Sequence, residues 1–275
     1  KGDFEVAEKL HWRALKIRQS VLGLEHPSTA QSLGNLALLF HIQCRYDQAE
    51  PLYKTLLDIR TKDWGPKHMH VAEVLNSLAE VYKDQGNFSE AEQHYWRAMT
   101  ITQENLGPEH PSVATSLQNL AELYELAENF DEADRLYKWG LGLSEKTLGA
   151  EHPDTITAVD TLSQLLSDLN KLEEALPLKR ESLSIKRKQL GDRHPDTLLS
   201  VNNLAVLLND LGRASGSTKM LREAEPLKRE ALAGCREVLG NRHPHTLASL
   251  HNLALLLQSH EEFEAAEPLL REALE

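Results

Sequence analysis

A short motif, Leu-Gly-x-x-His-Pro, occurs five times along the chain and a sixth time in the degenerate form Trp-Gly-x-x-His-Met at residues 64–69. The glycines of the six copies stand at positions 23, 65, 107, 149, 191 and 240, so the motif returns after 42 residues four times and then after 49. A fixed period of this length is typical of stacked structural repeats that share one continuous core. We therefore expect the 275 residues to form one domain.

Two amphipathic helix patterns alternate between the motifs. After each motif, the pattern Leu-x-x-Leu-Ala-x-x-Tyr, or a close variant, places apolar residues along a single helical stripe, and we name this helix A. Before each motif, a bulky apolar residue precedes an Ala by three positions, as in Phe88 and Ala91, and we name this helix B. Seven B helices and six A helices predict an all-α solenoid of thirteen antiparallel helices without a strand.

The motif positions set the expected repeat boundaries within the single domain of residues 1–275. Because the chain opens inside a repeat, we expect it to be a fragment of a longer protein. The segments are a half repeat, 1–22, and the repeats 23–64, 65–106, 107–148, 149–190, 191–239 and 240–275. The longer repeat holds a polar insertion between Gly212 and Leu221, which we expect to be a flexible loop, either regulatory or a tolerated surface insertion.

The motif itself indicates a junction between helix B and helix A. Gly suits the left-handed residue that closes helix B, and Pro fits the first turn of helix A, where its missing N–H is not needed. The six histidines could be metal ligands or catalytic groups, or they could be turn residues whose rings cap a backbone group. Since they recur one repeat apart and cannot converge on one point, we favour the capping role.

Composition excludes several classes of function. A formal net charge of −12 argues against a nucleic-acid-binding surface, and no apolar run is long enough to insert into a membrane. Cys44 and Cys235 lie in different repeats and form neither a disulfide framework nor a metal motif, which favours a reducing, cytoplasmic location. No phosphate-binding loop, nucleophile elbow or paired-His motif is present, so we expect no catalytic residue, metal or cofactor.

The two helix patterns resemble the tetratricopeptide repeat (TPR). The 42-residue period, the Leu-Gly-x-x-His-Pro junction and segments such as Val201-Asn-Asn-Leu-Ala-Val-Leu-Leu208 are similar to the long variety of this repeat found in kinesin light chains and nephrocystin-3-like proteins. The resemblance implies a right-handed superhelix whose A helices line a concave groove, with the B helices outside. It also implies binding of short, extended peptides in that groove.

The resemblance further implies that an Asn one place before the second Leu of helix A bonds the peptide backbone. The residues at this position are Asn35, Ser77, Asn119, Thr161, Asn203 and Asn252, and Asn76 and Asn202 occupy the neighbouring groove-facing position. Ser77 and Thr161 interrupt the asparagine ladder. For any single Asn, the alternative is an ordinary solvated helix residue.

The expected groove positions are mostly acidic. Lys83 is the one basic residue among them, and the acidic ones are Glu73, Glu80, Asp84, Glu122, Glu125, Asp160, Asp168 and Asp210. Repeats that capture carboxylates need Lys or Arg in the groove, so this pattern favours an extended basic segment with an apolar anchor, held along its backbone by Asn119 and Asn203. The alternative is that Glu is present only as a good helix former on a solvated surface.

These observations predict a non-catalytic interaction scaffold that binds peptide segments of partner proteins, as in a kinesin-light-chain-like cargo adaptor. The alternative is a TPR sensor or regulatory region of a larger enzyme, such as a nucleotide-binding signalling protein.

Overall fold

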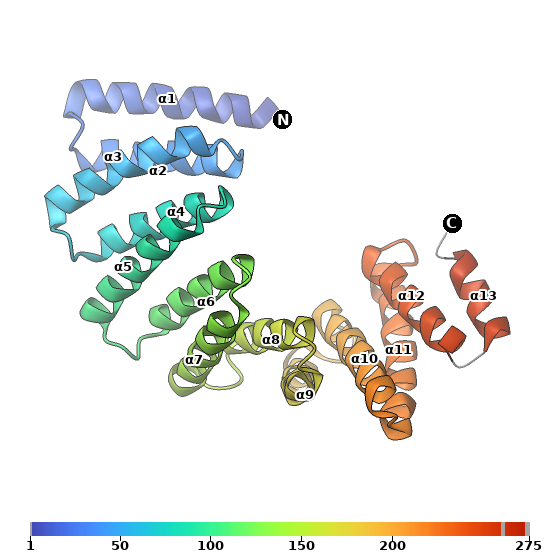
Figure 1. Cartoon of the computed structure of the whole chain (residues 1–275). Helices are drawn as coiled ribbons and strands as arrows, with labels where there is room; N and C mark the ends of the chain where they lie inside the picture. The colour runs from blue at the N-terminus through green and yellow to red at the C-terminus, as the bar shows by residue number, and fades with distance from the viewer. Residues whose placement is uncertain (1, 260–261, 273–275) are drawn as a thin grey trace. The chain divides into compact units, whose positions relative to one another are not determined.

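The computed structural model describes residues 2–259 and 262–272 of the chain (Figure 1). Within these residues the chain forms thirteen α-helices and no strand, as the alternating stripes predict. The helices are α1 (Gly2–Leu22), α2 (Pro27–Ile42), α3 (Tyr46–Trp64), α4 (Met69–Asp84), α5 (Phe88–Leu106), α6 (Pro111–Leu126), α7 (Phe130–Leu148), α8 (Pro153–Asp168), α9 (Leu172–Leu190), α10 (Pro195–Ser215), α11 (Thr218–Leu239), α12 (Pro244–Ser259) and α13 (Phe263–Glu272). Even-numbered helices are A helices and odd-numbered helices are B helices.

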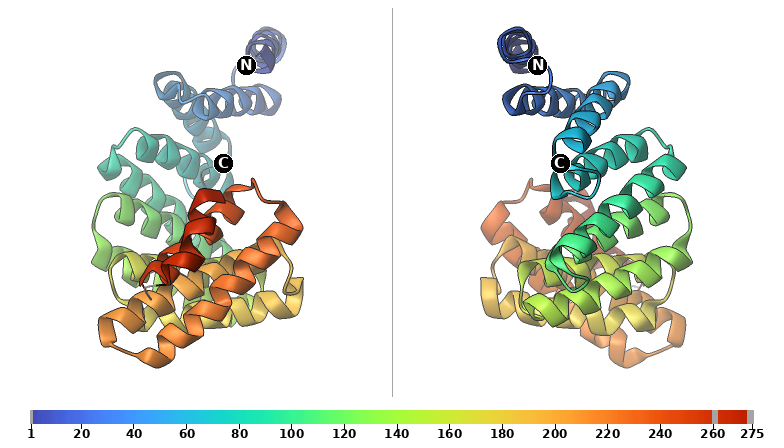
Figure 2. Two further views of the ribbon diagram at one scale, coloured as in Figure 1. Left: turned by 90° about the vertical axis from the view of Figure 1, so that its right-hand side faces the viewer. Right: turned by 90° about the vertical axis from the view of Figure 1, so that its left-hand side faces the viewer.

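The chain divides into two compact units, which we describe separately. Unit 1 is Lys1–Thr147 and contains helices α1 to α7, whereas unit 2 is Leu148–Glu275 and contains helices α8 to α13. Within each unit, consecutive helices run antiparallel and pack against each other, as Figures 1 and 2 show. The architecture within each unit is therefore the predicted stack of A–B helix pairs.

The predicted apolar stripes form the core of both units. On α6, Leu120 and the neighbouring Ala121 have no exposed surface, and Ala133 on the following B helix is equally buried. In unit 2, Leu204 is 3% exposed and packs in one cluster with Ala224 of α11. The small residue lets the next helix approach closely, so each helix contacts its neighbours along a continuous line.

The six junction histidines are helix caps. Each lies immediately before its A helix, and its Nδ1 accepts a hydrogen bond of 3.1–3.2 Å from the backbone N–H two residues later. This satisfies one of the unpaired N–H groups of the first helical turn. Among the described residues, no group of three or more His, Cys, Asp or Glu side chains is placed to hold a metal ion. The capping interpretation of these histidines is therefore confirmed.

The junction glycines adopt a conformation that requires the absence of a side chain. Their φ angles lie between 83° and 92°, so each glycine that closes a B helix has a positive φ. The ψ angles of Gly65, Gly107, Gly191 and Gly240 are 155–167°, so these residues occupy the extended positive-φ region, which corrects the expectation of a left-handed residue at this position. That region is essentially restricted to glycine.

The insertion in the longer repeat is helical, which corrects the expectation of a flexible loop. Helix α10 has 21 residues where α8 has 16, and α11 has 22 where α9 has 19, so the insertion mainly lengthens both helices. Gly216 ends α10 in the left-handed conformation, and the hydroxyl of Ser217 accepts a hydrogen bond from the N–H of Met220. At the start of the extension, Leu211 is 6% exposed, so an apolar residue anchors it.

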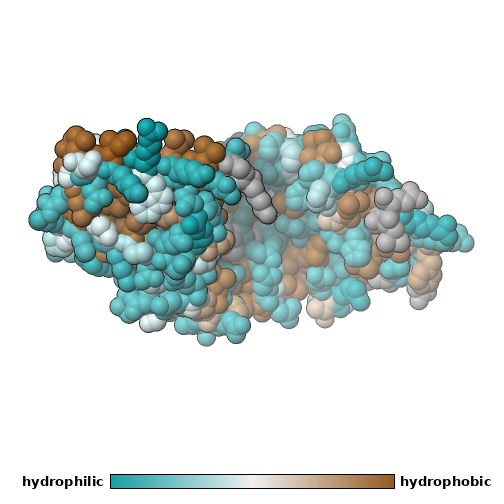
Figure 3. Space-filling model, turned by 90° about the horizontal axis from the view of Figure 1, so that it is seen from above, coloured by the Kyte–Doolittle hydropathy of each residue, from teal (hydrophilic) through white to brown (hydrophobic). Residues whose placement is uncertain are grey.

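The outer face of α1 carries exposed apolar side chains. Leu10, Ile17 and Val21 are 58%, 53% and 74% exposed. Figure 3 looks down on the end of unit 1 at which α1 lies, and apolar side chains stand there among polar ones. None of the described helices combines the length and the apolar character needed to span a bilayer.

Candidate functional site

The eleven candidate residues all lie on A helices, but their environments differ. Asn35, Glu122 and Asn203 are exposed, whereas Lys83 and Asn202 are buried. The other six are half-buried: Asn76, Glu80, Asn119, Glu125, Asp160 and Asn252. We call the surface formed by these positions the A-helix face, and it is described within each unit.

In unit 1, Lys83 links two A helices on this face. Its Nζ lies 2.8 Å from Oε2 of Glu80 on the same helix and 3.1 Å from Oε1 of Glu122 on α6, and the side chain is only 8% exposed. Burial lowers the pKa of Lys83, but the two carboxylates outweigh burial, so its pKa is raised overall. Lys83 is therefore charged, and its ion pairs link α4 to α6.

Tyrosines of the B helices donate hydrogen bonds to two carboxylates of this face, those of Glu80 and Glu125. The hydroxyl of Tyr95 on α5 donates to Oε1 of Glu80, and the hydroxyl of Tyr137 on α7 donates to Oε2 of Glu125 at 3.0 Å. Burial is the largest cause that raises the pKa of both phenols, and the neighbouring carboxylates raise it further. Glu80 and Glu125 are thus held by hydrogen bonds within the unit, whereas Glu122 keeps 52% of its side chain exposed.

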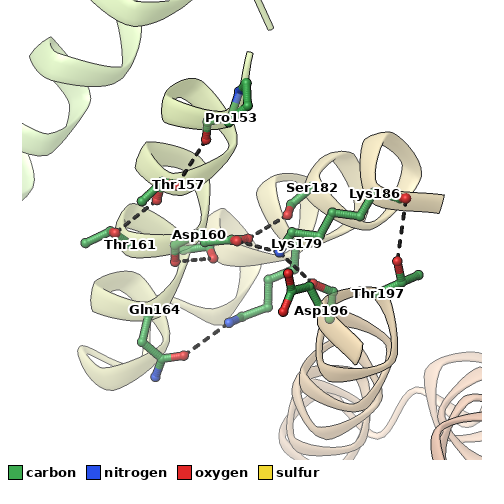
Figure 4. A network of polar contacts seen from close by, with 12 residues as sticks. Pro153, Thr157, Asp160, Thr161, Gln164, Lys179, Ser182, Lys186, Asp196 and Thr197 are labelled. Carbon is green, nitrogen blue, oxygen red and sulfur yellow. Dashed lines mark hydrogen bonds and ion pairs between the residues drawn. The ribbon is translucent and has the colours of Figure 1, made fainter. Parts of the chain in front are cut away.

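In unit 2, Asp160 belongs to a network that joins three helices (Figure 4). Its Oδ1 accepts a hydrogen bond of 2.6 Å from Ser182, and its Oδ2 lies 2.5 Å from Nζ of Lys186, both on α9. The same ammonium group donates to Oγ of Ser200 on α10 at 2.8 Å. Asp160 therefore joins α8 to α9, and Lys186 extends this network to α10.

The three candidate asparagines of unit 2 line one pocket of about 350 Å³ on its A-helix face. The Nδ2 of Asn252 on α12 donates to Oδ1 of Asn202 on α10 at 3.2 Å, and this contact joins two successive A helices. The residues lining the pocket are Gln164, Ser167, Asp168, Leu172, Lys179, Asn202, Asn203, Val206, Leu207, Asp210 and Asn252. The structure thus gathers these asparagines, whereas Asn35, Asn76 and Asn119 lie in unit 1.

Two buried lysines of the B helices were missed by the sequence reasoning. Lys179 is 9% exposed and Lys228 is 3% exposed, and each follows the recurring Ala of its B helix by four positions. Burial lowers the pKa of both ammonium groups. The sequence carries a signal for them, because the same B-helix position holds Tyr53, Tyr95 and Tyr137 in unit 1, whereas the expected groove positions all lie on A helices.

Comparison with known proteins gives a consistent result. A family model described as tetratricopeptide repeat matches residues 1–62, 70–146 and 206–275, and a second model with the same description matches residues 155–196. A sequence comparison with curated proteins finds no match.

Solved structures resemble the chain as well. A Podosopora anserina protein with nearly identical TPR-like repeats of the kinesin light chain kind is 28% identical, with a TM-score of 0.63, and the match covers 75% of this chain and 94% of that one. BtubC (BKLC) from P. vanneervenii is 20% identical, with a TM-score of 0.58 over 98% of this chain and 89% of that one. A Rap protein complexed with competence and sporulation factor is 17% identical, with a TM-score of 0.55 over 99% of this chain and 70% of that one. The last two likenesses concern the fold alone.

Proposed function

Because the chain belongs to the tetratricopeptide repeat family, we propose that it is a non-catalytic interaction scaffold that binds extended peptide segments of partner proteins along its A-helix faces. Within this class, a cargo-adaptor role of the kinesin light chain kind is supported by the 28% identity to the Podosopora anserina repeats. A reducing, cytoplasmic setting fits the two free cysteines, one of them exposed.

One observation carries the proposal: amide side chains line a pocket on the A-helix face of unit 2. Asn202, Asn203 and Asn252 all border it, and an amide offers both a donor and an acceptor, as a peptide backbone does. An extended peptide leaves its own N–H and C=O groups unpaired, so it gains most from such side chains. The exposed Asn35 and the half-buried Asn119 offer the same groups in unit 1.

The A-helix face of unit 1 favours a basic segment with an apolar anchor. Lys83 offsets part of the charge of Glu80 and Glu122, but Glu73 and Glu125 add two more carboxylates to the same helices. The net charge of this face is therefore negative, and a negative surface attracts cations over about 8 Å at physiological salt. The exposed Leu38 and Ile42 of α2 offer an apolar contact for the anchor.

A titration with labelled peptides tests this function. A Lys-rich peptide with one Leu should bind the wild-type chain more tightly than its Glu-rich counterpart, and the difference should shrink at high salt. Glu122→Lys should weaken binding of the basic peptide. Glu145→Lys makes the same charge change at an exposed position of the B helix α7 and should leave binding unchanged. Equal binding of both peptides, or equal effects of both substitutions, would contradict the assignment.

A further inference from the structure

The hairpin formed by α10 and α11 is longer than the preceding hairpin of unit 2. The two helices run side by side up to the turn at Gly216 (Figure 1). Helix α10 has 21 residues where α8 has 16, and at 1.5 Å per residue the difference corresponds to about 7 Å. The N–H of Ser217 donates a hydrogen bond of 2.9 Å to the carbonyl of Gly212 and closes the turn. We call residues 211–222 the hairpin tip.

The hairpin tip carries positive charges only. It contains Arg213, Lys219 and Arg222 and no Asp or Glu, in a chain whose formal net charge is −12. All three basic side chains are exposed. Among the described residues none of the three forms an ion pair, whereas Arg229, further along α11, binds a glutamate of its own helix. The three charges are therefore available to a partner.

The backbone of the hairpin brings these three side chains together. Gly212 on α10 lies so close to Leu221 on α11 that a Cβ atom on the glycine would stand 3.0 Å from the leucine side chain. Arg213 and Arg222 are the next residues on the two helices, so they start from neighbouring backbone positions. Lys219 precedes Arg222 by three positions, and residues at this spacing lie on one face of a helix. The tip is therefore a compact cluster of positive charge.

The carboxylates that flank the tip in the sequence have other partners. Glu223 lies 2.7 Å from Nη2 of Arg180 on α9. Oδ1 of Asp210 accepts a hydrogen bond of 3.2 Å from Nδ2 of Asn209. In the part of the chain that the structure describes, neither carboxylate forms an ion pair with a side chain of the tip.

A short acidic segment of a partner protein fits this surface better than a long polyanion does. Carboxylates of such a segment can pair with the three cations, and complementary charges set the choice of partner. A nucleic acid or an anionic membrane extends beyond the tip and meets a chain of net charge −12, which repels it. Because charges are screened over about 8 Å at physiological salt, the attraction is restricted to a segment that lies on the tip itself.

We propose that the tip of the α10–α11 hairpin is a docking site for an Asp- and Glu-rich segment of a partner protein, which binds Arg213, Lys219 and Arg222. None of the tip residues lines the asparagine pocket of unit 2, so this site is distinct from that pocket. Its ligand has the opposite charge to the basic segment assigned to unit 1. The chain then offers two surfaces that select partners of opposite charge.

Binding of a labelled acidic peptide to the full chain tests the site. The peptide is rich in Asp and Glu and has blocked ends, and its neutral counterpart has Asn and Gln in the same places. At about 0.1 M salt the wild-type chain should bind the acidic peptide about tenfold more tightly than the neutral one, since three exposed ion pairs act together. The ratio of the two affinities should approach one at about 1 M salt, where the screening length is about 3 Å. The net negative charge of the chain should keep the acidic peptide weaker than the Lys-rich peptide.

Charge reversal then locates the effect on the tip. Arg213→Glu/Lys219→Glu/Arg222→Glu should lower the acidic-to-neutral ratio to about one or less. The corresponding triple Gln variant removes the charges without reversing them and should lower the ratio in the same direction. Circular dichroism and thermal melts report whether each variant is folded.

A matched control separates the site from the net charge of the chain. Lys9→Glu/Arg13→Glu/Lys16→Glu makes the same change in net charge at three exposed positions of α1, a helix that also carries three carboxylates. This control should keep most of the wild-type ratio. The Lys-rich peptide should bind the tip variant and the control equally, so the test is independent of the proposed function.

Three results would overturn the proposal. The first is a ratio of one for the wild-type chain at low salt, and the second is an equal loss in the tip variant and in the control. The third concerns the class of partner: an RNA oligonucleotide or phosphatidylserine vesicles would bind more tightly than the acidic peptide and lose that binding in the tip variant.

Discussion

The hydroxyl of Tyr137 on α7 donates a hydrogen bond of 3.0 Å to Oε2 of Glu125 on α6. One repeat later the equivalent B-helix position is Lys179, whose ammonium group donates to Gln164 instead. In unit 1 this position therefore carries a neutral phenol that binds an acidic residue of the A helix. In unit 2 it carries an ammonium group that binds a neutral amide. This substitution makes the two A-helix faces chemically different.

The bond between Tyr137 and Glu125 should contribute measurably to stability. Tyr137→Phe removes the donor and leaves a half-buried carboxylate without it, so we expect a loss of about 1–2 kcal/mol in the free energy of unfolding. Urea melts of Tyr137→Phe, Glu125→Gln and the double variant form a cycle that isolates the pair. Strictly additive losses would show that the two side chains do not interact.

The raised phenol pKa values make stability depend on alkaline pH. Tyr95 and Tyr137 have a higher pKa in the folded chain because burial, and then the nearby carboxylates, disfavour the phenolate. An unfolded tyrosine releases its proton near pH 10, whereas these two retain theirs, so unfolding releases protons and the free energy of unfolding falls as pH rises above about 10. Urea melts between pH 8 and 11 should show this fall, and Tyr95→Phe/Tyr137→Phe should reduce its slope. An unchanged slope would contradict the assignment.

Core packing on α6 gives a direct comparison of two leucines. Leu120 is completely buried and Leu126 is 52% exposed. Leu120→Ala should cost about 2–5 kcal/mol, because it removes buried methyl groups and leaves a cavity, whereas Leu126→Ala should stay within about 0.5 kcal/mol of wild type. Similar urea midpoints for the two variants would show that the stripe is misassigned.

The histidine cap can be replaced by another capping residue. His110→Ala removes the acceptor of the Ser112 N–H and should destabilise the chain by about 1 kcal/mol, whereas His110→Asn should restore most of the loss. Thermal melts of the two variants against wild type check this. If Asn destabilises as much as Ala, the ring of His110 matters for a reason other than the cap.

The sequence predicts the helices well because their signals are local. The spacing of Leu120, Ala121 and Tyr124 on one stripe, and the glycine and histidine of each junction, depend only on residues near one another in the chain. The insertion was misread for the same reason. Its Gly and Ser residues suggest a loop, but one left-handed Gly216 and one capping Ser217 suffice to turn between two longer helices.

The apolar pattern of a single helix does not predict which charged side chains form ion pairs between helices. Lys83 forms an ion pair with Glu122, which lies 39 residues later in the chain. Lys186 of the B helix α9 forms an ion pair with Asp160 of the preceding A helix, α8. These contacts depend on the stacking of neighbouring helices, which the stripes do not specify. A count of acidic positions along the A helices therefore overestimates the free negative charge and overlooks Lys179.

The central claim is that partner peptides lie on the A-helix faces, and nuclear magnetic resonance of side-chain amides tests it most directly. During titration with the Lys-rich peptide, the ¹⁵N-labelled amides of Asn119, Asn203 and Asn252 should shift, whereas that of Asn105, on the B helix α5, should not. Shifts confined to Asn105 and other B-helix amides, or no shift at saturating peptide, would contradict the account.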